Sequence, residues 1–186
     1  MKLRNCCILI FILVNEVFGG WAYEDQDLHC PAQEHFSGFI RKLAGKRKEI
    51  QHRCAPFAPK ISDDTMCYLG IAFKCNGNFE MCSDPAAWIG GFQVFDMGDK
   101  LETYVPYCCV SSEVTVRNTK CRQSTLSGSP NANVNYAIPN DRLLYRFSCE
   151  YTKALFGERL TGMKMTAEDC AYTVDKKKRR SKRKTL

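Results

Sequence analysis

Ten cysteines in the body of the chain are the feature that most limits how it can fold. The sequence holds 12 cysteines, of which Cys6 and Cys7 lie in an apolar N-terminal segment. The remaining ten are an even number and fit up to five disulfides. Disulfides persist in oxidising compartments, so this count predicts an extracellular protein. The cysteines predicted to form disulfides are Cys30, Cys54, Cys67, Cys75, Cys82, Cys108, Cys109, Cys121, Cys149 and Cys170.

The spacing of the cysteines favours disulfides over a metal site. No Cys-x-x-Cys pair occurs, and only three histidines are present as further ligands. Zinc sites need such pairs or histidines at ligand spacing, so we predict no metal and no cofactor. Cys108 and Cys109 are adjacent and are poor partners for each other. We expect them to join one strand to two separate elements, while the rest of the connectivity stays open.

The N-terminal segment has the features of a signal peptide. Lys2 and Arg4 precede an apolar run at residues 6–14, and Asn15 and Glu16 end that run. A membrane-spanning helix needs about 20 apolar residues, and no later segment supplies them either. We therefore interpret residues 1–20 as a signal peptide and predict a secreted protein without a transmembrane segment.

Positive charge is concentrated at the C-terminus. The formal net charge of +7 includes eight basic tail residues and one net positive charge in the leader, so the residues between them carry −2. A run of like charges cannot bury apolar surface, so residues 176–186 are predicted to be a disordered tail. Its basic residues are Lys176, Lys177, Lys178, Arg179, Arg180, Lys182, Arg183 and Lys184.

Three interpretations of the tail remain open. Clustered cations suit a glycosaminoglycan, whose dense charge rewards them through counterion release. Residues 180–183 read Arg-Ser-Lys-Arg and resemble the Arg-x-Lys-Arg site of furin-like convertases. The third interpretation is a solubilising end without a partner. A nucleic-acid partner is not predicted, because the leader directs the chain out of the cell.

Apolar spacing predicts one helix near the N-terminus of the mature chain. Residues 33–53 place their apolar side chains at mostly helical intervals, with most cations on the other face. We expect this helix to pack its apolar stripe on the core, in preference to binding a membrane surface or a receptor. Cys30 and Cys54 bracket it. The apolar positions are Phe36, Phe39, Ile40, Leu43 and Ile50.

The rest of the chain favours strands. Residues 88–95 and 101–107 are rich in aromatic and β-branched side chains and predict a β-hairpin. Alternating apolar residues predict further strands near residues 114–116, 134–138 and 143–151, and residues 124–133 have loop composition. The expected fold class is a small disulfide-rich α+β domain over residues 21–175, β-rich with one N-terminal amphipathic helix.

The histidines and glycines of the sequence do not form a recognised catalytic motif. His29, His35 and His52 all lie near the predicted helix, and no Gly-x-Ser-x-Gly, His-Glu-x-x-His or phosphate-binding glycine loop accompanies them. We therefore predict a protein that is not an enzyme, with no catalytic residues.

One stretch resembles a known family. Cys82-Ser83, the Trp-Ile-Gly-Gly of residues 88–91, Leu101 and Cys108-Cys109 occur in an order similar to part of the Wart domain of nematode hedgehog-related warthog proteins. The resemblance covers about residues 82–109. It implies a secreted, cysteine-rich protein with a role in cuticle, epidermis or cell signalling. Many members carry a C-terminal autoprocessing module that is not found here, so autocleavage and sterol attachment are not predicted.

Together these features predict a secreted, non-enzymatic cysteine-rich protein for binding or signalling. Its partner would be an extracellular protein or receptor, with matrix retention through the basic tail. One alternative is a protease inhibitor or effector that displays residues 124–133 on a disulfide scaffold. Another is a prohormone-like precursor cleaved at basic sites.

Overall fold

The computed structural model describes residues 26–44, 47–61, 65–96, 102–155 and 160–175. Within these ranges the chain forms twelve strands and no helix. None of the described residues therefore belongs to a helix that could cross a membrane. The predicted leader and the predicted basic tail lie outside the described residues.

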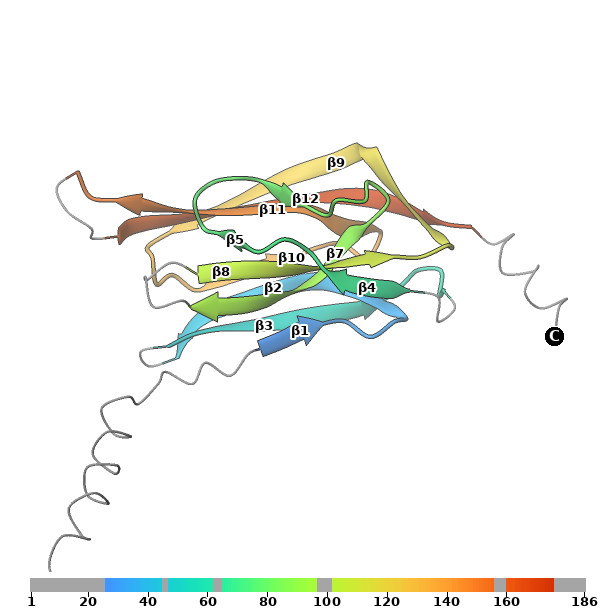
Figure 1. Cartoon of the computed structure of the whole chain (residues 1–186), viewed down its shortest axis with the longest axis horizontal. Helices are drawn as coiled ribbons and strands as arrows, with labels where there is room; N and C mark the ends of the chain where they lie inside the picture. Colours follow the sequence, from blue (N-terminus) through green and yellow to red (C-terminus); the bar gives the residue numbers. More distant parts are fainter. Residues whose placement is uncertain (1–25, 45–46, 62–64, 97–101, 156–159, 176–186) are drawn as a thin grey trace, which may run out of the picture.

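The strands form three antiparallel sheets (Figure 1). Sheet A has the order β1-β7-β8-β4, and β5 also pairs with β8. Its strands are β1 (Gln26–His29), β4 (Met66–Leu69), β5 (Phe73–Lys74), β7 (Trp88–Asp96) and β8 (Glu102–Val110). Sheet B has the order β10-β2-β3, formed by β2 (Glu34–Ala44), β3 (Arg47–Pro56) and β10 (Val134–Ala137). Sheet C has the order β6-β11-β12-β9, formed by β6 (Glu80–Met81), β9 (Val114–Gly128), β11 (Arg142–Lys153) and β12 (Leu160–Val174).

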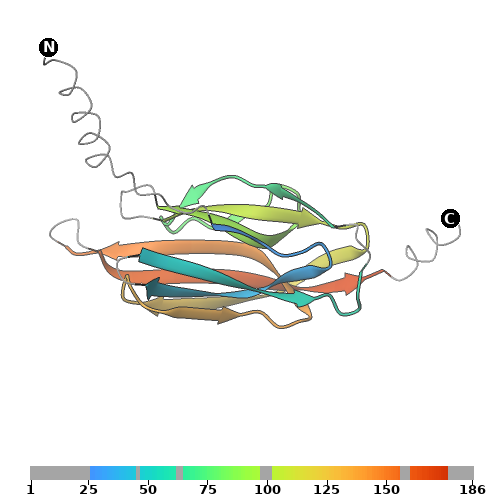
Figure 2. The same ribbon diagram turned by 90° about the horizontal axis from the view of Figure 1, so that it is seen from below.

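The sheets make two layers, with sheet A on one side and sheets B and C sharing the other (Figure 2). Aromatic rings fill the space between the layers. Phe92 of β7 contacts Phe36 of β2 and Phe147 of β11, at ring-centroid distances of 5.9 and 4.9 Å. A second buried cluster joins Phe57, Trp88 and Tyr172. Aromatic side chains bury large apolar areas, so these two clusters supply much of the stabilising core.

The predicted N-terminal helix is wrong, because residues 34–44 and 47–56 form the β2–β3 hairpin. The pairing shifts by one residue between Phe36 and Gly38, which marks a β-bulge at Ser37. The bulge lets Phe36 and Phe39 both enter the core although they are three residues apart. Three-residue spacing is the signature of a helix, so the bulge makes a strand look helical. The expected α+β class is accordingly corrected to an all-β fold in the described residues.

The helix prediction also placed the charged side chain of Arg41 incorrectly. A helix would place this cation in water, opposite the apolar stripe. In the hairpin it shares the inward face with Phe39 and is 1 % exposed.

The predicted strands after residue 87 are present. The hairpin is β7 paired with β8, and the later alternating segments lie in β9, β10 and β11. The long strand β12 was not anticipated. Its Met163, Met165 and Ala167 alternate into the core. This alternation is hard to recognise in the sequence, because these residue types have little preference for strands.

The ten cysteines form five disulfide bonds, as the cysteine count predicts, some between layers and some within one sheet. Cys108 and Cys109 of β8 bond to Cys82 and Cys67, so adjacent cysteines do join one strand to two elements. Cys75–Cys149 connects the residue after β5 to β11 of the other layer. The remaining pairs are Cys30–Cys54 and Cys121–Cys170.

Candidate polyanion-binding surface

A large bulge interrupts β9, which forms one edge of sheet C. Val116 pairs with Tyr172 and Cys121 pairs with Cys170, so residues 117–120 lie opposite the single Ala171. All four bulged residues are exposed. Bulges at sheet edges redirect side chains and end regular pairing. The bulge therefore turns Arg117 and Lys120 out of the regular ladder.

The Cys121–Cys170 disulfide closes the base of this bulge. The two cysteines are direct cross-strand neighbours, with a Cα–Cα distance of 3.9 Å. The covalent link fixes the point at which regular pairing resumes, so the bulged residues are held at one end by more than backbone hydrogen bonds.

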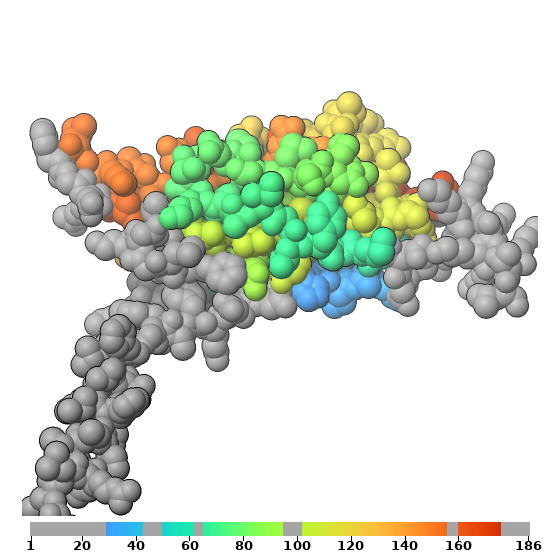
Figure 3. Space-filling model, in the orientation of Figure 1, coloured from blue at the N-terminus to red at the C-terminus, as the bar shows by residue number. Residues whose placement is uncertain are grey.

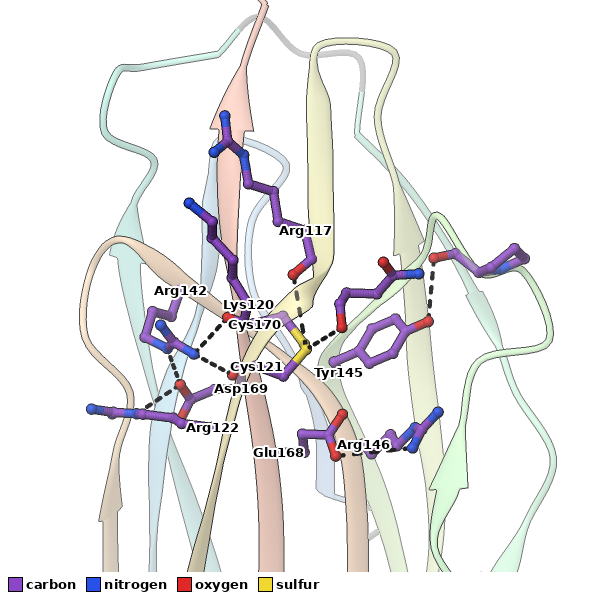
Figure 4. The surroundings of a disulfide bond; sticks show 12 residues. Arg117, Lys120, Cys121, Arg122, Arg142, Tyr145, Arg146, Glu168, Asp169 and Cys170 are labelled. Atoms are coloured by element: carbon purple, nitrogen blue, oxygen red, sulfur yellow. Dashed lines mark hydrogen bonds and ion pairs between the residues drawn. A yellow bond between two sulfur atoms is a disulfide. The ribbon is translucent and has the colours of Figure 1, made fainter.

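Four cations gather on one side of β9 beside this disulfide (Figure 4). Arg117 and Lys120 come from the bulge, Arg122 from the strand beyond it, and Arg142 from the start of β11. We call these four residues the basic surface. Arg146 is separate from it, because its side chain lies on the other side in Figure 4 and approaches Glu168 at 3.9 Å.

Asp169 of β12 holds two members of the basic surface in place. Its side chain is fully buried and accepts a hydrogen bond from Arg122 Nε to Oδ1 at 2.9 Å. Arg142 Nε donates to the same carboxylate. Arg142 Nη2 also donates to the carbonyl oxygens of Lys120 at 2.9 Å and Asp169 at 2.7 Å. These bonds fix the Arg142 guanidinium and tie it to the bulge.

The hydroxyl of Tyr136 completes the environment of Asp169. It donates to Asp169 Oδ2 at 2.9 Å. Burial, together with the charge of Asp169, raises the pKa of Tyr136 above its ordinary value of 10.0, so the phenol keeps its proton. Asp169 is thus bonded from three sides.

The net charge of the basic surface is positive. One buried carboxylate faces two guanidinium groups, and Arg117 and Lys120 add two further charges. Arg122 remains accessible, since its side chain is 48 % exposed. Arginine binds carboxylate and sulfate-like groups through paired donors, so a fixed and partly exposed arginine suits an anionic polymer.

The described chain ends close to this surface, at the residue that precedes the predicted basic tail. Val174 pairs with Val114, and the Asp175 N–H donates to the Glu113 carbonyl at 2.8 Å. Arg117 lies three residues further along β9, which is about 10 Å in an extended strand. The eight cations of the tail itself lie outside the described residues. The last described residue before the tail, Asp175, therefore lies beside the start of β9.

A group with metal-like spacing also occurs here, formed by Cys121, Glu168 and Cys170. Metal binding to cysteine requires thiolates. Both sulfur atoms are joined in the disulfide, so this group offers no thiolate ligand.

The loop predicted for a protease inhibitor is shorter than expected. Residues 124–128 belong to β9, which leaves residues 129–133 as the connection to β10. Buried Arg41 donates to the Pro130 carbonyl at 2.9 Å and to the Ala132 carbonyl at 3.1 Å. The loop is therefore anchored to the core.

Each of the three histidine rings lies next to an aromatic ring. His35 lies against Phe57, His52 against Phe36 and His29 against Tyr107, at centroid distances of 5.2, 5.6 and 5.0 Å. Burial lowers the pKa of His35, and it lowers that of His52 to about 4.

Sequence reasoning placed positive charge in the tail and missed the basic surface. One signal was available, because residues 114–128 contain three cations and no carboxylate. The contribution of Arg142 could not be found in this way, since only the fold brings β11 close to the bulge. No family model, curated protein or solved structure matches the chain.

Proposed function

We propose that this protein is a secreted, non-enzymatic binding protein that attaches to sulfated polysaccharide of the extracellular matrix through its basic surface and basic tail. The observation that carries the proposal is the fixation of Arg122 and Arg142 on buried Asp169, beside the bulge that presents Arg117 and Lys120. The five disulfides support an extracellular location, where oxidising conditions keep them intact.

The tail and the basic surface would make different contributions. An unstructured run of cations gives affinity by counterion release but little selectivity. Guanidinium groups with fixed positions favour a particular spacing of sulfate groups. We therefore assign capture of the polymer to the tail and discrimination among sulfation patterns to the basic surface.

Heparin affinity over a salt series tests this proposal. One variant of the full chain replaces the tail cations by Gln, and another carries Arg117→Ala and Lys120→Ala. Both should elute at lower salt than the wild type. The slope of log affinity against log salt concentration should become shallower by about one unit for each cation–sulfate pair that the substitutions remove. Arg146→Ala is the matched control and should elute with the wild type, because Arg146 lies on the other side of β9. If neither variant changes heparin binding, the proposal is wrong.

The Arg117/Lys120 variant also separates the two parts of the proposal. If it binds differently sulfated heparins like the wild type while the tail variant does not bind at all, the tail alone is responsible. Intact mass of the secreted protein is needed alongside, because convertase cleavage after Arg183 would trim the last three residues.

A second candidate function is protease inhibition by residues 129–133. The observation that favours it is the double anchor of Arg41 on the Pro130 and Ala132 carbonyls, since rigid loops bind with less entropic cost. Inhibition assays across the protease classes test it, with Arg41→Met expected to weaken any inhibition found.

Kinship with the Wart domain also stays a proposal. Residues 88–91 of the resemblance fall on β7, Cys108 and Cys109 on β8, and Cys82 in the disulfide with Cys108, whereas Leu101 lies outside the described residues. A structure of a Wart domain with the same pairing of β7, β8 and this disulfide would support it.

A further inference from the structure

Sheet A has one edge that is long and exposed, and most of it, residues 65–73, carries no charge. The edge is formed by β4 and β5, which pair in turn with β8 along residues 107–110 and 103–104. Between them, the Gly70 N–H donates to the Pro106 carbonyl at 2.8 Å. Residues 66–74 therefore cover nearly the whole length of β8, and within the described residues no strand pairs with their other side.

Apolar side chains accumulate on this edge. Met66, Leu69 and Ile71 are 69, 54 and 79 % exposed, and Tyr68 is 39 % exposed. Figure 3 shows residues 66–74, in teal to green, at the surface of the face turned to the viewer.

The other long edges carry the charges with which proteins protect exposed strands. Strand β9 holds Arg117, Lys120 and Arg122, and β3 holds four charged residues. Residues 65–73 hold none. An edge without protective charge is a site for pairing with another strand.

The register shows which backbone groups the edge offers. Cys67 lies directly opposite Cys109 with a Cα–Cα distance of 4.0 Å, which is the narrow spacing of a non-hydrogen-bonded antiparallel pair. In such a pair the N–H and C=O groups point away from the partner strand. The backbone groups of Cys67 and, two residues on, Leu69 therefore point outward, whereas Gly70, of the other parity, bonds to β8.

We propose that this edge pairs with the same edge of a second copy of the chain. A two-fold axis at Tyr68 would place Cys67 opposite Leu69 of the second copy, and Leu69 opposite its Cys67. Each pair would exchange two backbone hydrogen bonds, four in all. The two Tyr68 rings would face each other as a cross-strand aromatic pair.

A second copy suits this edge because a two-fold axis brings each residue near its own counterpart. Any charge in the strand would meet a like charge, and residues 65–73 carry none. The pairing involves a short strand, so the interface is small and the dimer should be a weak one, with a dissociation constant roughly in the micromolar range. The proposal is independent of polysaccharide binding, since β4 and β9 belong to different sheets.

Sedimentation equilibrium of the full secreted chain at physiological salt, without polysaccharide, tests the proposal. Leu69→Pro removes an outward N–H without removing a bond to β8, and edge strands tolerate proline. Each dimer then loses two hydrogen bonds, so association should weaken by about ten-fold or more. Leu155→Lys is the matched control, because Leu155 is 97 % exposed and follows β11. Its dimerisation should equal that of the wild type.

A charge exchange at the two-fold axis gives a second, independent readout. Tyr68→Glu and Tyr68→Lys should each be monomeric alone, because like charges would face each other, and their mixture should form a heterodimer. Five disulfides in each variant would verify folding. A wild type that stays monomeric up to about 1 mM, a dimer insensitive to Leu69→Pro, or a mixture that does not associate would overturn the proposal. Association with an unrelated chain alone would likewise exclude the second copy as the occupant.

Discussion

Arg41 and Glu102 form an ion pair buried in the core, with Arg41 Nη2 donating to Glu102 Oε1 at 2.9 Å and side-chain exposures of 1 and 4 %. Arg41 also donates to the Tyr151 hydroxyl at 3.0 Å, and Tyr104 donates to Glu102 Oε2 at 3.0 Å. The pair joins β2 of sheet B to β8 of sheet A. Buried charges are tolerated only when they are paired and hydrogen-bonded, and these bonds meet that requirement.

Removing one member of this pair should be costly. Arg41→Met leaves the Glu102 carboxylate buried without its cation and releases the Pro130 and Ala132 carbonyls. We expect the free energy of unfolding to fall by about 3–5 kcal/mol, measured by chemical denaturation. The double variant Arg41→Met/Glu102→Leu should recover part of this loss, because no unpaired charge remains. A double variant as unstable as the single one would show that the carboxylate is not the source of the loss.

The ion pair also shows where sequence reasoning stops. The cysteine count predicts that disulfides form, and the alternating residues after residue 87 predict the β7–β8 hairpin. Which cysteines pair does not follow from the sequence. The β2–β3 hairpin was missed because a bulge at Ser37 imitates helical spacing. The partner of Arg41 lies 61 residues away, so nothing near Arg41 in the sequence announces its burial. The basic surface depends in the same way on contacts between distant strands.

Gly38 shows a sequence signal that was available and not used. Its φ of +138° is one that other residues rarely adopt, and an added Cβ would lie 2.1 Å from the Tyr136 carbonyl oxygen. A glycine in the interior of an amphipathic helix is unfavourable, whereas beside a bulge it allows β10 to approach β2 closely.

Asp169→Asn separates the number of charges on the basic surface from their positions. The substitution raises the net charge by one, so charge counting alone predicts tighter heparin binding. We expect weaker binding, because Arg122 and Arg142 lose the carboxylate that orients them. Stability should fall by about 1–3 kcal/mol, since the two arginines lose their anionic acceptor and the amide presents an NH2 group where a carboxylate oxygen accepted hydrogen bonds. Elution at higher salt than the wild type would contradict the positioning role of Asp169.

Stability should decrease at mildly acidic pH. The pKa of His52 is lowered to about 4 and that of His35 is also lowered, both mainly by burial. Below the ordinary value of 6.5 the unfolded chain binds more protons at these sites than the folded protein. The free energy of unfolding therefore falls as the pH drops from about 6.5 towards 4. Melting temperatures across this interval check it, and His52→Phe should flatten the dependence. An equal slope in that variant would place the pH dependence elsewhere.

The disulfides should differ in how much they stabilise the protein, according to the length of chain each one closes. Cys75–Cys149 spans 74 residues and Cys30–Cys54 spans 24. Loop-closure entropy in the unfolded chain then gives losses of about 4.5 and 3.5 kcal/mol when each pair is replaced by alanine. The loss-of-stability gap between the Cys75/Cys149 and Cys30/Cys54 variants should exceed the entropic difference of about 1 kcal/mol. The reason is that Cys75 and Cys149 are both buried in the aromatic core, where replacement by alanine leaves a cavity. Denaturant unfolding of the two double variants compares them directly. An equal or smaller loss for Cys75/Cys149 would mean that its link between the layers is already secured by the packing around Phe147 and Phe92.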